Sequence, residues 1–204
     1  MLSPSHQWHI DEQVRHISSS VIVSNHLSYL DPLLFISLLK KQKTIVKSKF
    51  FNIPIFGNML AWFGYVPSDA YGKHSQIMIK NMETMSDYLS SGGNLFIFPE
   101  GTRSKDGNIN ILNPGAFKIA KRCRAPIQVV WIANTDHLFR PGKFLFNTGI
   151  SNHIVVKRID TLYPDQYDQV SISELTLMIH ALLGRKENES LINVNAGCNS
   201  NCHS

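Results

Sequence analysis

The sequence predicts an α/β fold, a single domain with a mostly parallel or mixed sheet flanked by helices. Short β-branched and apolar runs alternate with longer amphipathic stretches along most of the chain. A length of 204 residues suits one domain with its own core. We expect that domain over residues 1–184 with its core at 21–160. A disordered tail is expected at 185–204, where Asn and Ser are frequent.

The elements are predicted from the period of the apolar residues, which is two in strands and close to four in helices. In chain order, strands are expected at residues 21–23, 44–47, 65–66, 94–98, 127–132 and 153–158. Helices are expected at residues 33–39, 55–62, 73–89, 115–122 and 173–183. The first helix has a start signal, because Asp31 suits the N-cap and Pro32 suits the first turn.

The first predicted strand is followed by Asn25-His26-Leu27-Ser28-Tyr29-Leu30-Asp31. On one continuous helix, a His and an Asp five positions apart would lie on different faces. At a strand-to-helix turn, the carboxylate can fold back onto the imidazole and make its other nitrogen more basic. His26 would then be a general base that Asp31 orients. The other interpretation is that Asp31 only caps the helix and His26 is a loop histidine.

The same His-x4-Asp spacing occurs at His6 and Asp11, in a polar N-terminal stretch for which no preceding strand is predicted. We therefore expect no function from that pair.

The strand predicted at residues 94–98 is followed by Pro99-Glu100-Gly101-Thr102-Arg103-Ser104. Arg is the side chain best suited to binding phosphate through two hydrogen bonds, and Gly allows the backbone to approach a ligand closely. Sites in open α/β sheets lie at the carboxyl ends of strands, so we expect His26 and Arg103 at the same edge. The other interpretation is a polar loop with an Arg–Glu pair on the surface.

In this order and spacing, the two motifs resemble the Asn-His-x4-Asp and Phe-Pro-Glu-Gly-Thr-Arg-Ser blocks of the glycerolipid acyltransferases. The resemblance extends over residues 21–132. A middle block is similar at Lys47, Pro54, Phe56, Gly57 and Gly64, and later blocks are similar at 115–117 and 125–127. Ala70 stands where the family usually has an Arg, and Val129 where it usually has a second Pro.

The resemblance implies transfer of a fatty acyl group from acyl-CoA or acyl-carrier protein to the hydroxyl of a lysophospholipid. The acceptor it implies most directly is 1-acylglycerol-3-phosphate, in phospholipid synthesis. His26 and Asp31 would be catalytic, and the substrate-binding residues would be Asn25, Glu100, Gly101, Thr102 and Arg103. No metal or bound cofactor is implied. The alternatives are a catalytically lapsed lipid-binding member and an acyltransferase for another lysolipid.

A net charge of +5 suits acidic ligands or an anionic bilayer surface. Basic residues between Lys40 and Lys49 lead directly into an aromatic and aliphatic segment. This combination is typical of a segment that lies on a membrane, and contacts with membrane or acyl chain are expected from Phe50, Phe51, Ile55, Phe56 and Trp62. The same residues could instead fill the core. With no signal peptide and no spanning segment visible, we expect peripheral binding at the cytoplasmic face of a membrane.

Other functional classes lack their sequence signals. There is no zinc-finger spacing and no interleaved aromatic–basic pattern of a nucleic-acid binder. The phosphate loop of nucleotide-binding proteins and the Gly-x-Ser-x-Gly motif of α/β hydrolases are also absent.

Overall fold

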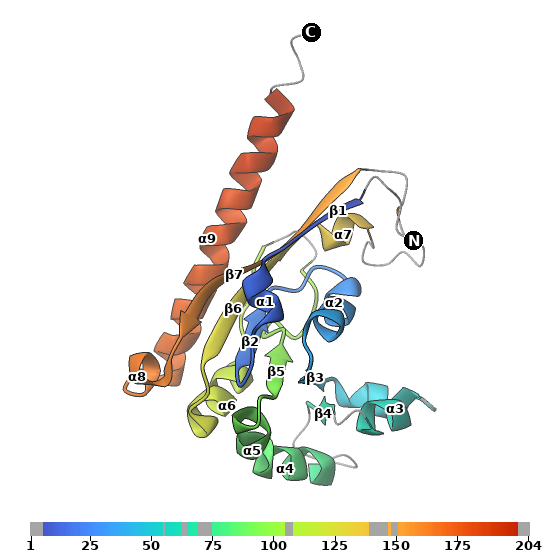
Figure 1. Ribbon diagram of the computed structural model, residues 1–204, viewed down its shortest axis with the longest axis vertical. Coiled ribbons are helices and arrows are strands. Elements are labelled where there is room, and N and C mark those ends of the chain that lie inside the picture. Colours follow the sequence, from blue (N-terminus) through green and yellow to red (C-terminus); the bar gives the residue numbers. More distant parts are fainter. Residues whose placement is uncertain are drawn as a thin grey trace.

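The computed structural model describes residues 6–54, 56–62, 65–68, 75–104, 108–138, 147 and 151–199. Over these residues the chain forms a sheet of seven strands with helices on both faces (Figure 1). The strands are β1 (His6–Ile10), β2 (Val21–Ser24), β3 (Gln42–Val46), β4 (Val66–Pro67), β5 (Asn94–Ile97), β6 (Ile127–Ala133) and β7 (Asn152–Leu162).

The helices connect successive strands in most of the chain. They are α1 (Glu12–Arg15), α2 (Leu30–Leu38), the 3₁₀ turn η1 (Ser48–Asn52), α3 (Phe56–Trp62), α4 (Ser75–Glu83), α5 (Met85–Ser90), α6 (Gly115–Cys123), α7 (Thr135–Leu138), α8 (Pro164–Tyr167) and α9 (Ile172–Asn199). The strand order is β1-β7-β6-β2-β5-β3-β4. Neighbours are parallel except β6 and β7, which run antiparallel. The predicted α/β class with a mixed sheet is confirmed.

The central strand β2 lies between β5 and β6, and it is buried because helices cover both of its faces. Val21 and Val23 pack on one face of the sheet with α5, α6 and α9, whereas Ile22 packs on the other face with α1 and α2. The period of two along a strand produces this alternation. A strand buried on both faces is a nearly continuous apolar run, which is the pattern that identified β2 from the sequence.

Several elements differ from the prediction. The strand β1 was not predicted, and His6 begins it rather than following a strand. Asp11 caps α1 by accepting a hydrogen bond from the backbone of Gln13. The predicted helix at 73–89 is two helices, because Thr84 interrupts it between α4 and α5.

The longest helix, α9, lies along one side of the sheet and extends beyond it (Figure 1). It continues to Asn199, through residues where the sequence predicted a disordered tail from 185. No proline occurs between Ile172 and Asn199, so no residue there removes a backbone donor from the helix.

Candidate active site

The two motifs meet because β2 and β5 are parallel neighbours. Val23 pairs with Ile97, and His26 and Glu100 each lie three residues beyond that pair. The backbone N–H of His26 donates to Oε1 of Glu100 over 3.0 Å. The predicted placement of both motifs at one sheet edge is therefore what the structure shows.

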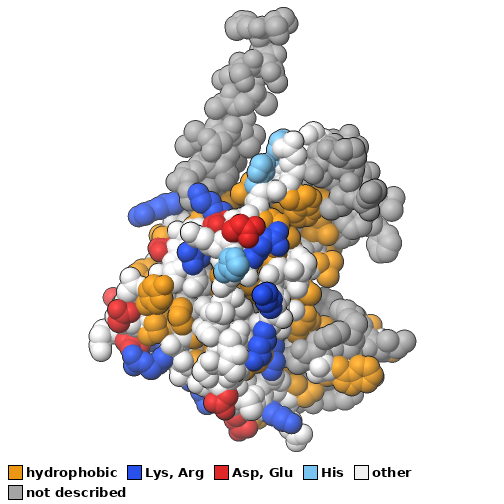
Figure 2. Space-filling model, viewed as in Figure 1, with side chains coloured by type: hydrophobic (Ala, Val, Ile, Leu, Met, Phe, Trp, Pro, Cys, Tyr) orange, Lys and Arg blue, Asp and Glu red, His pale blue; other side chains and the backbone are white. Residues whose placement is uncertain are grey.

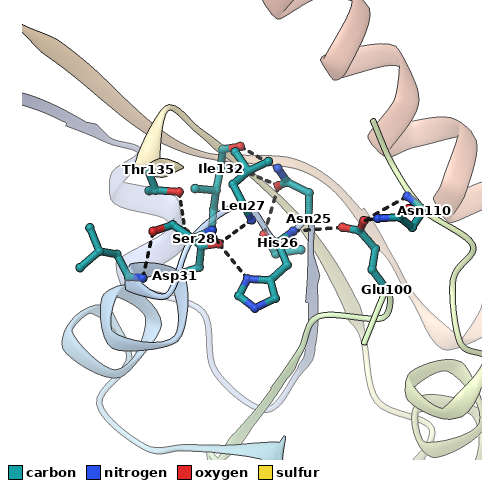
Figure 3. Close-up of polar contacts among 11 residues, drawn as sticks. Asn25, His26, Leu27, Ser28, Asp31, Glu100, Asn110, Ile132 and Thr135 are labelled. Atoms are coloured by element: carbon teal, nitrogen blue, oxygen red, sulfur yellow. Dashed lines mark hydrogen bonds and ion pairs between the residues drawn. The ribbon is translucent and has the colours of Figure 1, made fainter. Parts of the chain in front are cut away.

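His26 and Asp31 form a close pair at the turn from β2 to α2 (Figure 3). Nδ1 of the imidazole lies 2.9 Å from Oδ2 of Asp31. Asp31 is in the first turn of α2, whose N-cap is Tyr29, so the predicted N-cap role of Asp31 is wrong. The turn is compact enough that a five-residue separation brings the two side chains together.

The carboxylate of Asp31 is fully buried and surrounded by donors. Its Oδ2 also accepts the backbone N–H groups of Leu27, at 2.7 Å, and Ser28, at 2.8 Å. Its Oδ1 accepts the hydroxyl of Thr135 at 2.6 Å. A buried carboxylate is costly unless donors surround it, and here they also fix its direction toward His26.

The imidazole of His26 remains reachable, with 15% of its side chain exposed. It stacks on the ring of Phe98, with centroids 4.2 Å apart and planes 18° from parallel. Its second ring nitrogen points away from the other labelled residues (Figure 3). With Nδ1 bound to a carboxylate, Nε2 is left as the proton acceptor, which is the arrangement of a general base.

Glu100 holds the second motif against the first. Besides the N–H of His26, its carboxylate accepts both the backbone and the side-chain amide of Asn110. Arg103 forms no ion pair with it in the described part of the chain. The alternative of an Arg–Glu surface pair is therefore not what this loop forms, and Glu100 orders the loop instead.

Asn25 is fully buried and joins β2 to β6 beyond their regular pairing. Its Nδ2 donates to the carbonyl of Ile132, and its Oδ1 accepts the N–H of the same residue, both over 2.8 Å (Figure 3). Both ends of the amide are thus engaged with backbone. This geometry orients the start of the His26 turn.

The remaining residues of the second motif lie nearer the surface. Gly101 has a φ of +65°, a conformation that side chains rarely adopt, and its N–H closes a turn onto Phe98. Thr102 is exposed. Arg103 stacks over the ring of Tyr29, and the next residue, Ser104, donates its N–H to the carbonyl of His26.

Sequence reasoning missed Tyr29, Asn110 and Thr135. Thr135 follows a predicted strand, so the rule that sites gather at strand ends could have identified it. Asn110 and Tyr29 carry no comparable signal, because their contacts depend on the path of a loop and on a side-chain direction.

The expected membrane or acyl-chain residues separate into different environments. Phe51 is buried in a small cluster with Leu60 and Tyr65. Trp62 is 87% exposed, and Ile53 is 46% exposed. Ile55 lies outside the described residues, and no side-chain position is described for Phe50 and Phe56. The alternative that this segment fills the core therefore holds for Phe51 but not for Trp62.

No described helix combines the length and the apolar character needed to cross a membrane. Within the same described ranges, no three His, Cys, Asp or Glu side chains are grouped so that they could bind a metal.

The fold and site thus define an α/β protein with a His–Asp pair and an arginine loop at one sheet edge. Residues 6–133, more than half of the chain, match the family model described as Acyltransferase. The chain belongs to the acyltransferase family.

Two curated relatives that the chain resembles are both named 1-acyl-sn-glycerol-3-phosphate acyltransferase. The chloroplastic 1-acyl-sn-glycerol-3-phosphate acyltransferase BAT2 of Brassica napus is 35% identical over 133 residues, covering 65% of this chain and 37% of that protein. The 1-acyl-sn-glycerol-3-phosphate acyltransferase of Borreliella burgdorferi is 28% identical over 168 residues, covering 80% of this chain and 65% of that protein. The chain thus spans little more than a third of the plant relative.

A solved structure supports the fold. The crystal structure of the 1-acyl-sn-glycerophosphate acyltransferase PlsC of Thermotoga maritima has a TM-score of 0.69 and 22% identity. The match covers 90% of this chain and 72% of that one.

Proposed function

We propose that the chain is an O-acyltransferase that moves a fatty acyl group from a thioester donor to the hydroxyl of a lysophospholipid. The acceptor is 1-acylglycerol-3-phosphate, as the names of the relatives suggest. The donor in this proposal is acyl-CoA or acyl-carrier protein. The observation that carries this proposal is the buried Asp31 bound to a reachable His26, beside the Arg103 loop.

The geometry supports general-base catalysis with the substrate's own hydroxyl as the nucleophile. Nδ1–H of His26 donates to Asp31, so Nε2 accepts the hydroxyl proton as oxygen attacks the thioester carbonyl. The carbon–sulfur bond then breaks, and the leaving thiolate takes the proton from His26. The Asp31 carboxylate stabilises the imidazolium between the two steps. No metal or bound cofactor takes part in this scheme.

The phosphate of the acceptor binds at Arg103. One guanidinium nitrogen, Nη1, is buried and lacks a hydrogen-bond partner among the described residues. Burying a donor without a partner is costly, which favours an anionic ligand at this position. Gly101 and Thr102 lie in the same exposed turn, where backbone and hydroxyl can add contacts to the ligand.

We further infer that the chain works on a membrane surface, peripherally and at the cytoplasmic face. Hydrophobic side chains gather along the side of the molecule where α2 and α3 lie (Figure 2). Leu33 and Ile36 of α2 are exposed, as is Trp62 of α3. Lys40 and Lys47 are exposed close by in the sequence. Apolar contact together with basic charge suits an anionic bilayer.

The test is an assay of the purified chain with labelled acyl-CoA and acyl-carrier protein against a panel of lysolipids. We expect transfer to 1-acylglycerol-3-phosphate to exceed transfer to lysophosphatidylcholine and to monoacylglycerol. Equal rates of transfer to all three acceptors would exclude 1-acylglycerol-3-phosphate as the specific acceptor. Binding of lysolipid without transfer from either donor would identify a lapsed, lipid-binding member instead.

A further inference from the structure

Tyr29 belongs to the first motif in the sequence and contacts Arg103 of the second motif in the structure. It is the N-cap of α2, three residues after His26, and 51% of it is exposed. An exposed tyrosine at a helix start has no structural need to face a charged group. Its ring nevertheless lies against the guanidinium of Arg103.

The contact between Tyr29 and Arg103 has two components. The guanidinium carbon lies 3.6 Å from the ring centroid, a stacked cation–π arrangement. The second guanidinium nitrogen, Nη2, donates to the tyrosine hydroxyl over 2.9 Å. The first, Nη1, has no partner in the described part of the chain. Tyr29 therefore engages one side of the guanidinium, and the buried nitrogen on the other side still requires an acceptor.

The backbone around Arg103 is fixed at the same time. The N–H of Ser104 donates to the carbonyl of His26 over 2.8 Å. Backbone and side chain of the arginine loop are thus both tied to the segment that carries His26. An Arg side chain that is not held in this way loses rotamer entropy when it binds a ligand.

We propose that Tyr29 is a positioning residue for acceptor binding: it holds the Arg103 guanidinium in the orientation that receives the acceptor's phosphate. The proposal rests on the proposed function. Tyr29 does not touch the reacting atoms, so it acts on the affinity for a phosphate-bearing acceptor and not on the chemical step. Acceptors that lack a phosphate gain nothing from it.

The experiment compares Tyr29→Leu and Tyr29→Phe with the unaltered chain in steady-state kinetics. With 1-acylglycerol-3-phosphate, Tyr29→Leu should raise the acceptor KM about 10-fold, and Tyr29→Phe, which keeps the ring, about 3-fold. The kcat and the KM for acyl-CoA should stay within about twofold. Tyr163→Leu is the matched control, since that tyrosine is 54% exposed and is also an N-cap, that of α8, outside both motifs.

A double-mutant cycle separates positioning from a general effect on structure. In an Arg103→Ala background, Tyr29→Leu should raise the acceptor KM no further, because there is no guanidinium left to hold. An equal increase in both backgrounds overturns the proposal, as does a fall in kcat at unchanged acceptor KM. If Arg103→Ala itself leaves the acceptor KM unchanged, the phosphate-binding part of the proposed function fails as well.

A binding measurement does not depend on turnover. Titration with sn-glycerol 3-phosphate, followed by thermal shift, should stabilise the unaltered chain and stabilise Tyr29→Leu and Arg103→Ala less. If this holds in a chain that transfers no acyl group, the proposed function fails and the role of Tyr29 stands. If the unaltered chain is not stabilised, or Tyr29→Leu is stabilised equally, the role of Tyr29 is excluded.

Discussion

The two oxygens of the Asp31 carboxylate contact different parts of the chain. Oδ2 accepts from His26 and from two backbone N–H groups of the same turn, whereas Oδ1 accepts from Thr135 at the end of β6. The imidazole is therefore oriented by a group whose own position depends on a neighbouring strand. Such a second layer of contacts determines whether a catalytic pair keeps its geometry.

At the same scale, we expect His26→Ala to lower turnover by at least about 10²-fold, since general-base catalysis typically contributes that much. The loss of turnover is measured from initial rates at saturating acyl-CoA. His16→Ala is the control, because that histidine is exposed at the end of α1. Equal losses in two folded variants would overturn the assignment of the base.

Arg103→Lys should not preserve acceptor binding. The ammonium is a point charge that can neither stack flat on Tyr29 nor bind phosphate through two parallel hydrogen bonds. We expect the acceptor KM to rise about 10-fold or more, with kcat changed much less. A rise in the donor KM alone would mean that Arg103 binds the acyl donor instead.

The sequence predicted the position of those candidate-site residues that follow the end of a strand. His26, Asp31 and Arg103 follow predicted strands, so parallel pairing was enough to expect them together. The contacts of Tyr29 and Asn110 were not predictable, because loop path and rotamer determine them. The residues 50–63 were left open between core and surface, and the structure places Phe51 in the core and Trp62 at the surface.

At the scale of elements, Tyr167 of α8 joins α6 to the rest of the fold. Its side chain is fully buried, and its hydroxyl donates to the carbonyls of Ala125, at 2.6 Å, and Ala120, at 3.3 Å. The Ala120 carbonyl, near the end of α6, also accepts the backbone N–H of Ala125, whereas the Ala125 carbonyl lies in the link between α6 and β6, beyond the helix. Burial raises the pKa of the Tyr167 phenol to about 12.

This pKa predicts a loss of stability in alkali. In the unfolded chain the phenol loses its proton near pH 10, whereas in the fold it keeps that proton until about 12. Between these values the folded state binds one more proton, so the free energy of unfolding falls as pH rises. Urea unfolding at about pH 8 and about pH 11 should show a smaller fall for Tyr167→Phe than for the unaltered chain.

The substitution should also lower the free energy of unfolding at neutral pH by about 1–2 kcal/mol, because the buried carbonyl of Ala125 loses the phenol as its donor. Tyr88, whose pKa burial also raises to about 12, contributes to the alkaline fall in both proteins. Parallel falls in the two proteins would show that the Tyr167 phenol is not the group responsible.

Element prediction succeeded where burial is continuous and failed at the edge strand β1 and at the break between α4 and α5. The central strands β2, β5 and β6 are apolar along their length and were predicted within a few residues. The edge strand β1 pairs with β7 alone, and its sequence His-Gln-Trp-His-Ile has no apolar run to identify it. The helix break at Thr84 has no proline or glycine to mark it.

For the whole molecule, we expect salt-sensitive binding to anionic vesicles. Lys41 and Lys43 bind Ser91 and Asn81, so substitutions there would also disturb the fold. The exposed Lys40 and Lys47 are the better choice. Each basic residue near an anionic membrane contributes about 1 kcal/mol of attraction. Changing both lysines to Glu should therefore abolish the part of vesicle binding, measured by flotation, that high salt removes.

The matched control is Lys118→Glu with Lys157→Glu, which makes the same charge change on α6 and β7. Apolar insertion is not screened by salt, so the remaining bound fraction should be released by detergent. Equal loss in both double variants would mean that net charge, and not this surface, attracts the chain. No flotation at low salt would exclude the membrane proposal.

The bonds that hold His26 and Asn25 in place span long stretches of the chain. The N–H of His26 is bonded to Glu100, 74 positions later, and the amide of Asn25 to Ile132, 107 positions later. Contacts so distant in sequence form late in folding, because closing the intervening loops costs entropy before any contact compensates. The His26–Asp31 pair therefore reaches its final surroundings only when β2 has both β5 and β6 beside it. During refolding, helical signal should return before catalytic activity, and activity should appear together with the completed sheet.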